Sequence, residues 1–293
     1  MTAELFRQIS AQGAAANLTS RAKFRLTGAD RSRYLNGQVT NDVRRVRTDE
    51  TLYACVTDAK GRIAGDLFVH ATAEALLLDA EPDLRETLGM RLERYIVADD
   101  VELTDVTEEW QLWHVWGSTT DTPVCRERGT DGQECPSYSL RSTRFGVEGC
   151  DVWLPVGETF EPPCPVLTEE ELETWRVLQK VTRWPNELNA ETFPPEAGIT
   201  ERAMDFAKGC YIGQEVLSRI KTTGKMPREL FAWKSDASLA ADTEVLNAEG
   251  KAVGTVTSVT KHPETGACIG LAFVRQGTPR DALTASGSRL QQR

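Results

Sequence analysis

The sequence predicts an α+β fold, and three observations lead to that prediction. Strand-like and helix-like runs alternate irregularly in the first third of the chain and form no regular βαβ series. The residues from 228 onward carry only short β-like runs. With 293 residues, the chain is also longer than an ordinary domain, which favours two or three packed units.

The first predicted elements are a strand over residues 23–27 and a helical stretch that stops near Gly37. Residues 51–57 and 62–70 are both rich in β-prone side chains, and they flank a glycine-containing turn at 58–61. Two such runs around a short turn predict a β-hairpin.

A second helix is predicted to begin at Pro82, because apolar residues recur after it at helical spacing and proline suits a first turn. The residues on its apolar face are Leu84, Leu88, Leu92, Tyr95 and Ile96. Residues 117–137 are rich in Gly, Thr, Asp and Pro, which predicts a surface loop.

The middle of the chain contains two strand-like pieces, 139–146 and 151–154, followed by a proline-rich connector at 155–165. Thr168 and Glu171 have the spacing of a capping box, so a helix is expected from there to about Val181. After this helix, the short β-like runs 230–234, 252–260 and 267–274 predict a small all-β unit at the C-terminal end.

Composition and charge exclude several classes of protein. Hydrophobic residues make up 40% and charged residues 27% of the chain, which is typical of a globular protein. The net charge of −10 argues against direct binding of a nucleic acid backbone, which depends on Lys and Arg. No apolar run is long enough to span a membrane, and the N-terminal residues lack the pattern of a signal peptide. We therefore expect a cytoplasmic protein with no membrane partner.

The seven cysteines do not have the spacing of a metal site. They are widely separated, none forms a C-x-x-C pair, and only three histidines could assist them. The sequence therefore predicts no bound metal. Most of the cysteines are expected to be small buried residues.

The segment at residues 206–228 carries the strongest functional signal. It holds five basic residues and one acidic residue, a local net charge of +4 in an acidic chain. Gly209 and Gly213 bracket Cys210, and residues 214–221 can form a short helix. A thiol beside a helix N-terminus and several cations would be activated, whereas the alternative is a solvated basic turn with a buried cysteine.

The run Lys208-Gly-Cys-Tyr-Ile-Gly-Gln-Glu215 resembles the K-G-C-Y-x-G-Q-E signature of the YgfZ family, which is related to the glycine cleavage T-protein and to a mitochondrial iron–sulfur assembly factor. The resemblance extends along most of the chain. It includes the sequences Tyr34-Leu-Asn-Gly-Gln-Val-Thr-Asn-Asp-Val43, Leu52-Tyr-Ala-Cys-Val-Thr-Asp-Ala-Lys-Gly-Arg-Ile63 and Pro195-Glu-Ala-Gly198. Coverage is weakest over residues 110–165.

The resemblance implies a T-protein (aminomethyltransferase)-like fold, with two α+β domains and a small C-terminal β-barrel around a central channel for tetrahydrofolate. We expect residues 1–226 to form the two domains, which can interleave, with a connector near 155–167. Residues 227–293 would form the barrel. The implied role is support of iron–sulfur enzymes, including enzymes that modify tRNA, with iron–sulfur client or assembly proteins as partners.

Two departures from the T-protein pattern argue against aminomethyl transfer. In those relatives a helix carries R-x-E-A-G, but here Arg176 is followed by Leu178 at the Glu position and Lys180 at the Gly position. A D-D-L run is replaced by Gly65-Asp66-Leu67, so one carboxylate of a pair is missing. Since folate-dependent transfer needs an acidic group near the reacting amine, we expect an accessory protein more than an enzyme.

The resemblance and the residue types together nominate one functional thiol and a set of folate-binding residues. Cys210 is the expected functional thiol, and the basic segment around it is the expected mouth for the anionic tail of folate. The expected folate-binding residues are Lys208, Gly209, Tyr211, Gly213, Gln214, Glu215, Arg219, Asn36, Asn41, Asp66, Arg176 and Glu196.

Several of these residues have a purely structural alternative. Asp66 could be a solvated hairpin residue, and Glu196 could simply follow Pro195 on the surface. Asn36 and Asn41 could form turns, and Tyr211 could pack in the core. Two other functions also stay open: a folate-dependent aminomethyl transferase, and a thiol redox protein that would need a resolving cysteine brought close by the fold.

Overall fold

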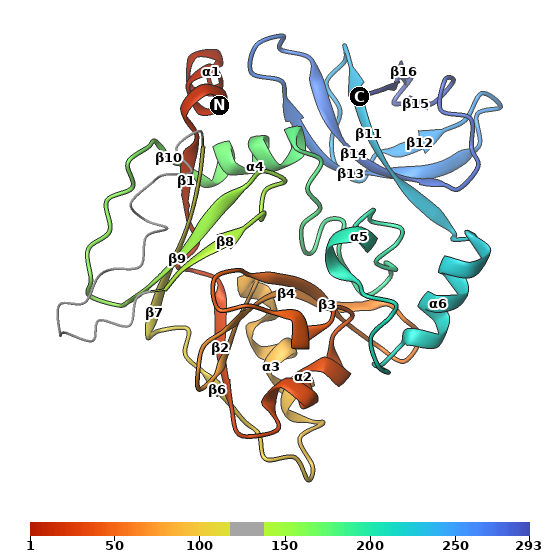
Figure 1. The fold of residues 1–293 in the computed structure, drawn as a ribbon. Helices are drawn as coiled ribbons and strands as arrows, with labels where there is room; N and C mark the ends of the chain where they lie inside the picture. Colours follow the sequence, from red (N-terminus) through yellow and green to blue (C-terminus); the bar gives the residue numbers. More distant parts are fainter. Residues whose placement is uncertain (118–137) are drawn as a thin grey trace.

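The computed structural model describes residues 1–117 and 138–293. The predicted loop at 117–137 falls almost entirely outside these residues. Three β-sheets make up the described part, and short helices pack between and around them (Figure 1). The C-terminal sheet lies beside the other two and is joined to them through the region of α4 and α6 (Figure 1).

Sheet I has the strand order β3-β4-β5-β2-β6. Its strands are β2 (Ala22–Thr27), β3 (Leu52–Thr57), β4 (Ile63–Ala71), β5 (Leu76–Ala80) and β6 (Glu102–Asp105). The predicted hairpin is confirmed, since β3 and β4 pair antiparallel around the turn at 58–61.

The two faces of sheet I differ in chemistry because successive side chains in a strand point to opposite sides. One face carries residues such as Leu67, Leu78 and Phe24, and it packs with α2 (Arg31–Gln38) and α3 (Arg85–Glu93) in an apolar core. The opposite face carries buried charged residues. This second face contributes to the candidate site.

The helix predicted from Pro82 forms as a 3-10 turn, η2 (Pro82–Leu84), that leads into α3. Leu84, Leu88 and Leu92 are buried, as predicted. The prediction was wrong for Tyr95 and Ile96, because α3 ends at Glu93 and these residues lie beyond it. Tyr95 stays largely exposed, and the Arg91 guanidinium lies 4.3 Å from its ring centroid.

Sheet II has the strand order β10-β1-β7-β9-β8. Its strands are β1 (Ala14–Asn17), β7 (Trp110–Trp116), β8 (Tyr138–Ser142), β9 (Gly149–Pro155) and β10 (Val166–Leu167). Two helices contribute to its apolar core: α1 (Ala3–Gln12), which the sequence analysis did not predict, and α4 (Glu169–Leu178). Thr168 and Glu171 form the predicted capping box at the start of α4.

Sheet III contains seven strands in the order β16-β15-β12-β13-β14-β11-β17 and curls into a nearly closed barrel (Figure 1). Its long strands are β11 (Arg228–Ser235), β13 (Ala252–Lys261) and β14 (Cys268–Arg275). The short ones are β12 (Glu244–Leu246), β15 (Thr284–Ala285), β16 (Ser288–Arg289) and β17 (Gln291–Gln292). All of residues 228–293 are described and they contain no helix, which confirms the predicted β-barrel-like unit.

The segment between α4 and the barrel is mostly irregular, with helices α5 (Thr200–Ala203) and α6 (Gln214–Thr223). The remaining short element is the 3-10 turn η1 (Val43–Arg45). Within residues 1–117 and 138–293, no helix has the length and apolar character needed to cross a membrane.

Candidate functional site

A cavity of about 210 Å³ lies between sheet I, helix α4 and the turn that precedes β9. It is smaller than the ~300–1,000 Å³ typical of pockets for drug-sized ligands, so it suits one ring system and not a whole extended molecule. The wall residues most relevant to its chemistry are Arg21, Tyr53, Asp66, Phe68, Arg144 and Arg176.

Asp66 is buried in the wall of this cavity, so it is not a solvated hairpin residue. The alternation along β4 places it on the face opposite Leu67, where Tyr53 donates a hydrogen bond to Asp66 Oδ2 at 3.0 Å. Asp66 Oδ1 has no hydrogen-bond partner among the described residues. Burial raises the pKa of Asp66 to about 6, although the nearby charge of Arg21 opposes this shift.

Arg21 lies just before β2 and is also buried in the cavity wall. Its Nε atom donates to Asp79 Oδ1 at 2.5 Å, and its Nη1 atom donates to Glu81. Arg183 holds Glu81 from the other side with a hydrogen bond of 3.2 Å. The Nη2 atom of Arg21 has no partner among the described residues, so this guanidinium keeps donor capacity that the protein does not use.

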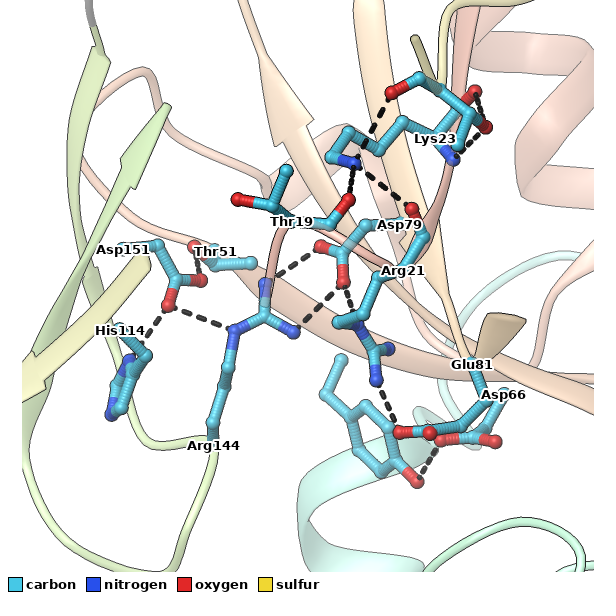
Figure 2. Close-up of polar contacts among 12 residues, drawn as sticks. Thr19, Arg21, Lys23, Thr51, Asp66, Asp79, Glu81, His114, Arg144 and Asp151 are labelled. Carbon is cyan, nitrogen blue, oxygen red and sulfur yellow. Dashed lines mark hydrogen bonds and ion pairs between the residues drawn. The ribbon is translucent and has the colours of Figure 1, made fainter. Parts of the chain in front are cut away.

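A buried charge network connects sheet I with sheet II behind this cavity. Figure 2 shows Arg144 between two carboxylates: its Nη2 atom lies 2.6 Å from Asp79 Oδ2 and its Nε atom 2.8 Å from Asp151 Oδ1. His114 Nδ1 lies 2.7 Å from the same oxygen of Asp151. Burial opposes ionisation of Asp151, but Arg144 and His114 outweigh it and hold the pKa of Asp151 below its usual range.

The network also fixes an aromatic side chain of the cavity wall. The Arg144 guanidinium lies 3.8 Å from the ring centroid of Phe68, a distance that favours a cation–π contact. The Phe68 ring in turn lies 4.8 Å from that of Tyr53. Two rings and a guanidinium therefore form one side of the cavity.

Arg176 also lines the cavity, but all five of its N–H donors are used within the protein. They reach both oxygens of Glu173, the Val181 carbonyl, Glu187 and Ser258. Glu187 is fully buried and also accepts a 2.6 Å hydrogen bond from Ser258 in the barrel. Arg176 thus ties α4 to the barrel and has no free donor for a ligand.

The signature segment at residues 208–215 contributes no lining residue to this cavity. Lys208 is buried, and its Nζ atom donates to the backbone carbonyls of Asn36, Val39 and Asn41 at 2.6, 2.6 and 2.7 Å. These carbonyls lie in and just after α2. Burial lowers the pKa of Lys208 to about 8, so the ammonium remains charged at neutral pH. Lys208 therefore holds the segment against α2.

The next residues of the segment fix it against the β3–β4 hairpin. Gly213 has φ +88°, and a Cβ atom there would lie 2.5 Å from the Asp58 carbonyl oxygen, so only glycine fits. Gln214 accepts a 3.3 Å hydrogen bond from the Tyr211 amide. The Tyr211 ring is buried in a cluster that also contains Tyr53 and Phe68 of the cavity wall, so it packs in the core.

The other predicted residues of the segment are exposed. Cys210 precedes α6, as predicted, and lies at the surface, as do Gly209, Glu215 and Arg219. The structure therefore does not place Cys210 in the wall of the cavity that contains Asp66. The exposed Cys210 thiol and the buried cavity are therefore two separate features.

Three further predicted residues hold backbone in place. Asn36 Oδ1 accepts a hydrogen bond from the Val43 amide at 3.0 Å, and Asn41 Nδ2 donates to the Tyr53 carbonyl at 2.9 Å. Glu196 is buried, not on the surface, and accepts a 3.0 Å hydrogen bond from the Phe193 amide. The contacts of Asn36 and Asn41 fit their structural alternative, whereas the surface position considered for Glu196 is wrong, and its Oε1 atom is buried without a partner among the described residues.

A residue just beyond the end of α4 has a backbone conformation that is typical of glycine, although it is a lysine. Lys180 has φ +59°, a left-handed conformation that favours glycine. The Val181 amide donates to the Arg176 carbonyl and the Lys180 amide to the Val177 carbonyl, which is the hydrogen-bond pattern of a glycine-terminated helix end. The backbone at Lys180 therefore has the geometry of a glycine-terminated helix end, with a lysine side chain.

The cysteines and acidic residues show no metal centre within the described ranges, where no group of three or more His, Cys, Asp or Glu side chains is placed to hold an ion. Cys55, Cys150 and Cys268 are buried, and Cys164 is partly exposed. Cys125 and Cys135 lie outside the described residues.

Most of the charged residues around the cavity were not among the predicted site residues. These are Arg21, Asp79, Glu81, His114, Arg144 and Asp151. One signal was available: Asp79 interrupts the apolar run Leu76–Ala80, and Asp151 begins another at β9. A charged residue inside an apolar strand needs a partner on the same buried face.

A family model described as GCVT N-terminal domain matches residues 3–154. Among curated proteins, the chain is 28% identical to the tRNA-modifying protein YgfZ of Escherichia coli O45:K1, over 73% of this chain and 69% of that protein. It is 27% identical to the mitochondrial iron–sulfur cluster assembly factor IBA57 homolog of Pyricularia oryzae, over 92% and 69% of the two chains. It is 26% identical to an aminomethyltransferase of Rubrobacter xylanophilus, over 84% and 72%.

Among solved structures, the glycine cleavage system aminomethyltransferase T of Bartonella henselae matches with a TM-score of 0.84. The match covers 99% of this chain and 87% of that chain at 13% sequence identity. The predicted T-protein-like fold is therefore confirmed.

Proposed function

Because this chain belongs to the GCVT N-terminal domain family, we propose that it is a folate-binding accessory protein that supports iron–sulfur enzymes, including enzymes that modify tRNA. The names of the relatives support the iron–sulfur and tRNA parts of this role. Its partners would then be folate and iron–sulfur client or assembly proteins.

The observation that carries the folate part is the cavity with two unpaired buried polar atoms, Asp66 Oδ1 and Arg21 Nη2. Unpaired buried polar groups cost free energy, and a ligand that pairs them recovers it. Tyr53 and Phe68 supply an aromatic surface for a flat ring. These features fit the pteridine end of folate.

The glutamate tail of folate would leave the cavity past two partly exposed cations of its wall, Arg183 and Arg202. The sequence predicted that the basic segment around Cys210 binds the tail, but this segment lines no part of this cavity. Arg219 and Lys221 remain exposed on α6. Since Arg183 is already paired with Glu81, Glu169 and Glu173, we assign tail binding to Arg202.

An accessory role fits this site better than catalysis of aminomethyl transfer. Leu178 stands where a carboxylate is expected, and Arg176 has no donor left for a ligand. Asp66 remains as a buried acidic group, and the aminomethyltransferase relative favours the enzyme as a second candidate. Formation of methylene-tetrahydrofolate from an aminomethyl donor, at a rate comparable to that of a true T-protein, would decide for the enzyme.

Cys210 is the proposed functional thiol. It is exposed on the described surface, while its neighbours Lys208, Tyr211 and Gly213 have clear roles in folding. A thiol redox function needs a second accessible cysteine, and among the described cysteines Cys55, Cys150 and Cys268 are buried and only Cys164 is partly exposed. We therefore favour a role in contact with a client protein.

Titration of the purified 293-residue chain with tetrahydrofolate, followed by tryptophan fluorescence, tests the folate part. Trp175 lies on α4, which lines the cavity, and Trp184 follows Arg183 of the cavity wall, so saturable quenching is expected. No saturable change, together with no heat of binding in calorimetry, would contradict folate binding.

Complementation tests the thiol part. Cells that lack their related protein should recover iron–sulfur enzyme activity with the wild-type chain and not with Cys210→Ser. Full recovery with the serine variant would show that the signature is only structural.

A further inference from the structure

The wall of the cavity presents one unused donor and one unused acceptor. Arg21 Nη2 and Asp66 Oδ1 are the polar side-chain atoms of the described cavity wall that are buried without a hydrogen-bond partner. Both residues are more than nine-tenths buried. The charge of each alters the proton affinity of the other, so they lie near one another, yet no ion pair joins these two described residues directly.

We propose that Arg21 and Asp66 together recognise a cyclic amide edge of the ligand, in which a ring carbonyl lies next to a ring N–H. The carbonyl accepts a hydrogen bond from Arg21 Nη2, and the N–H donates to Asp66 Oδ1. This inference rests on the proposed folate site, since the pteridine ring of folate carries such an edge. The residues that determine specificity are then Asp66 in sheet I and Arg21 just before strand β2 of that sheet, and none belongs to helix α4.

Helix α4 is poorly equipped for this task in the present chain. Leu178 cannot accept a hydrogen bond, and the Arg176 donors are all used within the protein. Glu173 also lines the cavity, but both of its oxygens accept from Arg176. The buried unpaired polar atoms of the described cavity wall therefore belong to Arg21 and Asp66 and not to α4.

The positions of the two recognition groups are fixed by their other contacts. Asp79 and Glu81 hold two nitrogens of Arg21, and Arg144 holds Asp79. Tyr53 holds the second oxygen of Asp66. The pair therefore cannot easily rotate to accept a ligand edge with the opposite pattern, and the cost of a mismatch is an unpaired buried group.

Two ligands that differ at a single ring position test the proposal. Folic acid carries the carbonyl and N–H, whereas aminopterin has an amino group in place of the carbonyl and no N–H beside it. At about pH 7, above the pKa of about 6 for Asp66, this carboxyl is mostly ionised and folic acid still carries its ring N–H. We expect calorimetry with the 293-residue chain to show folic acid bound at least tenfold more tightly.

Equal binding, or tighter binding of aminopterin, would overturn the proposed recognition while leaving a folate site intact. Binding of neither ligand would contradict the proposed function itself, and the recognition with it. The two failures are therefore distinguishable in one experiment.

Variants assign the effect to the two residues. Asp66→Asn should weaken folic acid at least tenfold without a lower thermal midpoint, because Tyr53 can still donate to the amide oxygen. Arg21→Lys keeps the charge beside Glu81 and removes the Nη2 donor, so the ratio of the two affinities should fall towards one. If Arg21→Lys does not fold, the comparison of folic acid with aminopterin and the affinity of Asp66→Asn for folic acid still test the proposal.

Asp42→Asn is the matched control. Asp42 is a buried carboxylate that pairs with Arg44 and lies outside the cavity wall, so its variant should bind both ligands as the wild type does. Unchanged folic acid affinity in Asp66→Asn would remove Asp66 from the recognition pair and overturn the proposal.

Discussion

The signature segment at residues 208–215 and the cavity of sheet I differ in how their charged side chains are paired, although the Tyr211 hydroxyl of the segment is also buried without a partner among the described residues. In the segment, Lys208 is saturated by three backbone carbonyls, and Gln214 accepts from a backbone amide. In the cavity, Asp66 and Arg21 are as deeply buried, yet each keeps an unpaired atom.

The contrast separates residues that a fold needs from residues that a ligand needs. Paired polar groups stabilise a structure, and unpaired buried groups destabilise it until a ligand arrives. Substitutions in the segment should therefore affect folding, and substitutions in the cavity should affect binding. Gly209, Cys210 and Glu215 are exceptions in the segment, because they are exposed.

The largest effect is expected for Lys208→Met. The variant leaves three carbonyls of the α2 region without their donor, which should lower the free energy of unfolding by about 3–5 kcal/mol. Denaturant unfolding measures this. Lys221→Met on the exposed face of α6 is the control and should change stability by less than about 1 kcal/mol. A comparable small change for Lys208→Met would break the contrast.

Replacing the two glycines of the signature by alanine should reduce stability by different amounts, with the larger loss at Gly213. Gly213→Ala forces a Cβ atom to within 2.5 Å of the Asp58 carbonyl at φ +88°, and we expect a loss of about 2–3 kcal/mol. A Cβ atom at Gly209 would meet no other atom within 4 Å, and φ there is not positive, so Gly209→Ala should cost less than about 1 kcal/mol. Thermal unfolding of both variants measures the difference. Equal losses would show that the close approach at Gly213 is unimportant.

The sequence predicts well those features that depend on residues close together in the chain. The capping box of Thr168 and Glu171 and the hairpin turn at 58–61 depend on neighbours within a few residues, and both form as predicted. The prediction for Tyr95 and Ile96 was wrong because apolar spacing persists after α3 has ended. The helix end depends on backbone contacts that the apolar pattern does not report.

The non-local part could not be predicted from the sequence. The signature indicates that Lys208 matters, but its acceptors lie about 170 residues earlier in the chain. The cavity network joins Arg21, Asp79 and Arg144, which share no motif. The pairing of β2 with β5 brings Arg21 close to Asp79, and the packing of sheet II against sheet I adds Arg144.

The pH dependence of stability tests whether the unpaired carboxylate is costly. Burial raises the pKa of Asp66 from 3.8 to about 6, so the folded chain holds a proton in this window that the unfolded chain has released. Its effect is to stabilise the fold as the pH falls from 6 to 4. Burial lowers the pKa of His70 from 6.5 to about 4, so the unfolded chain gains a proton there and the fold is destabilised. The two slopes oppose each other.

Asp66→Asn should remove one of these slopes and expose the other. Between about pH 6 and 4.5, we expect its free energy of unfolding to fall more steeply than in the wild type, by about 1.4 kcal/mol per pH unit. Above pH 7 the variant should be the more stable protein, because a buried charge is gone. Denaturant unfolding at a series of pH values measures both effects. Parallel profiles for the two proteins would show that Asp66 carries no such penalty.

The smallest effect on stability is expected for Cys210→Ser. Because the side chain is exposed and the segment is held by Lys208 and Gly213, the free energy of unfolding should change by less than about 0.5 kcal/mol.

The same exposure should make the thiol easy to reach. Iodoacetamide, followed by peptide mapping of the folded chain, should label Cys210 at least tenfold faster than Cys55, Cys150 or Cys268, which are buried. Denaturant should remove the difference, which controls for intrinsic reactivity. Equal labelling in the folded state, or a marked loss of stability in the serine variant, would place Cys210 with the folding residues of the segment and leave the signature without an accessible functional group.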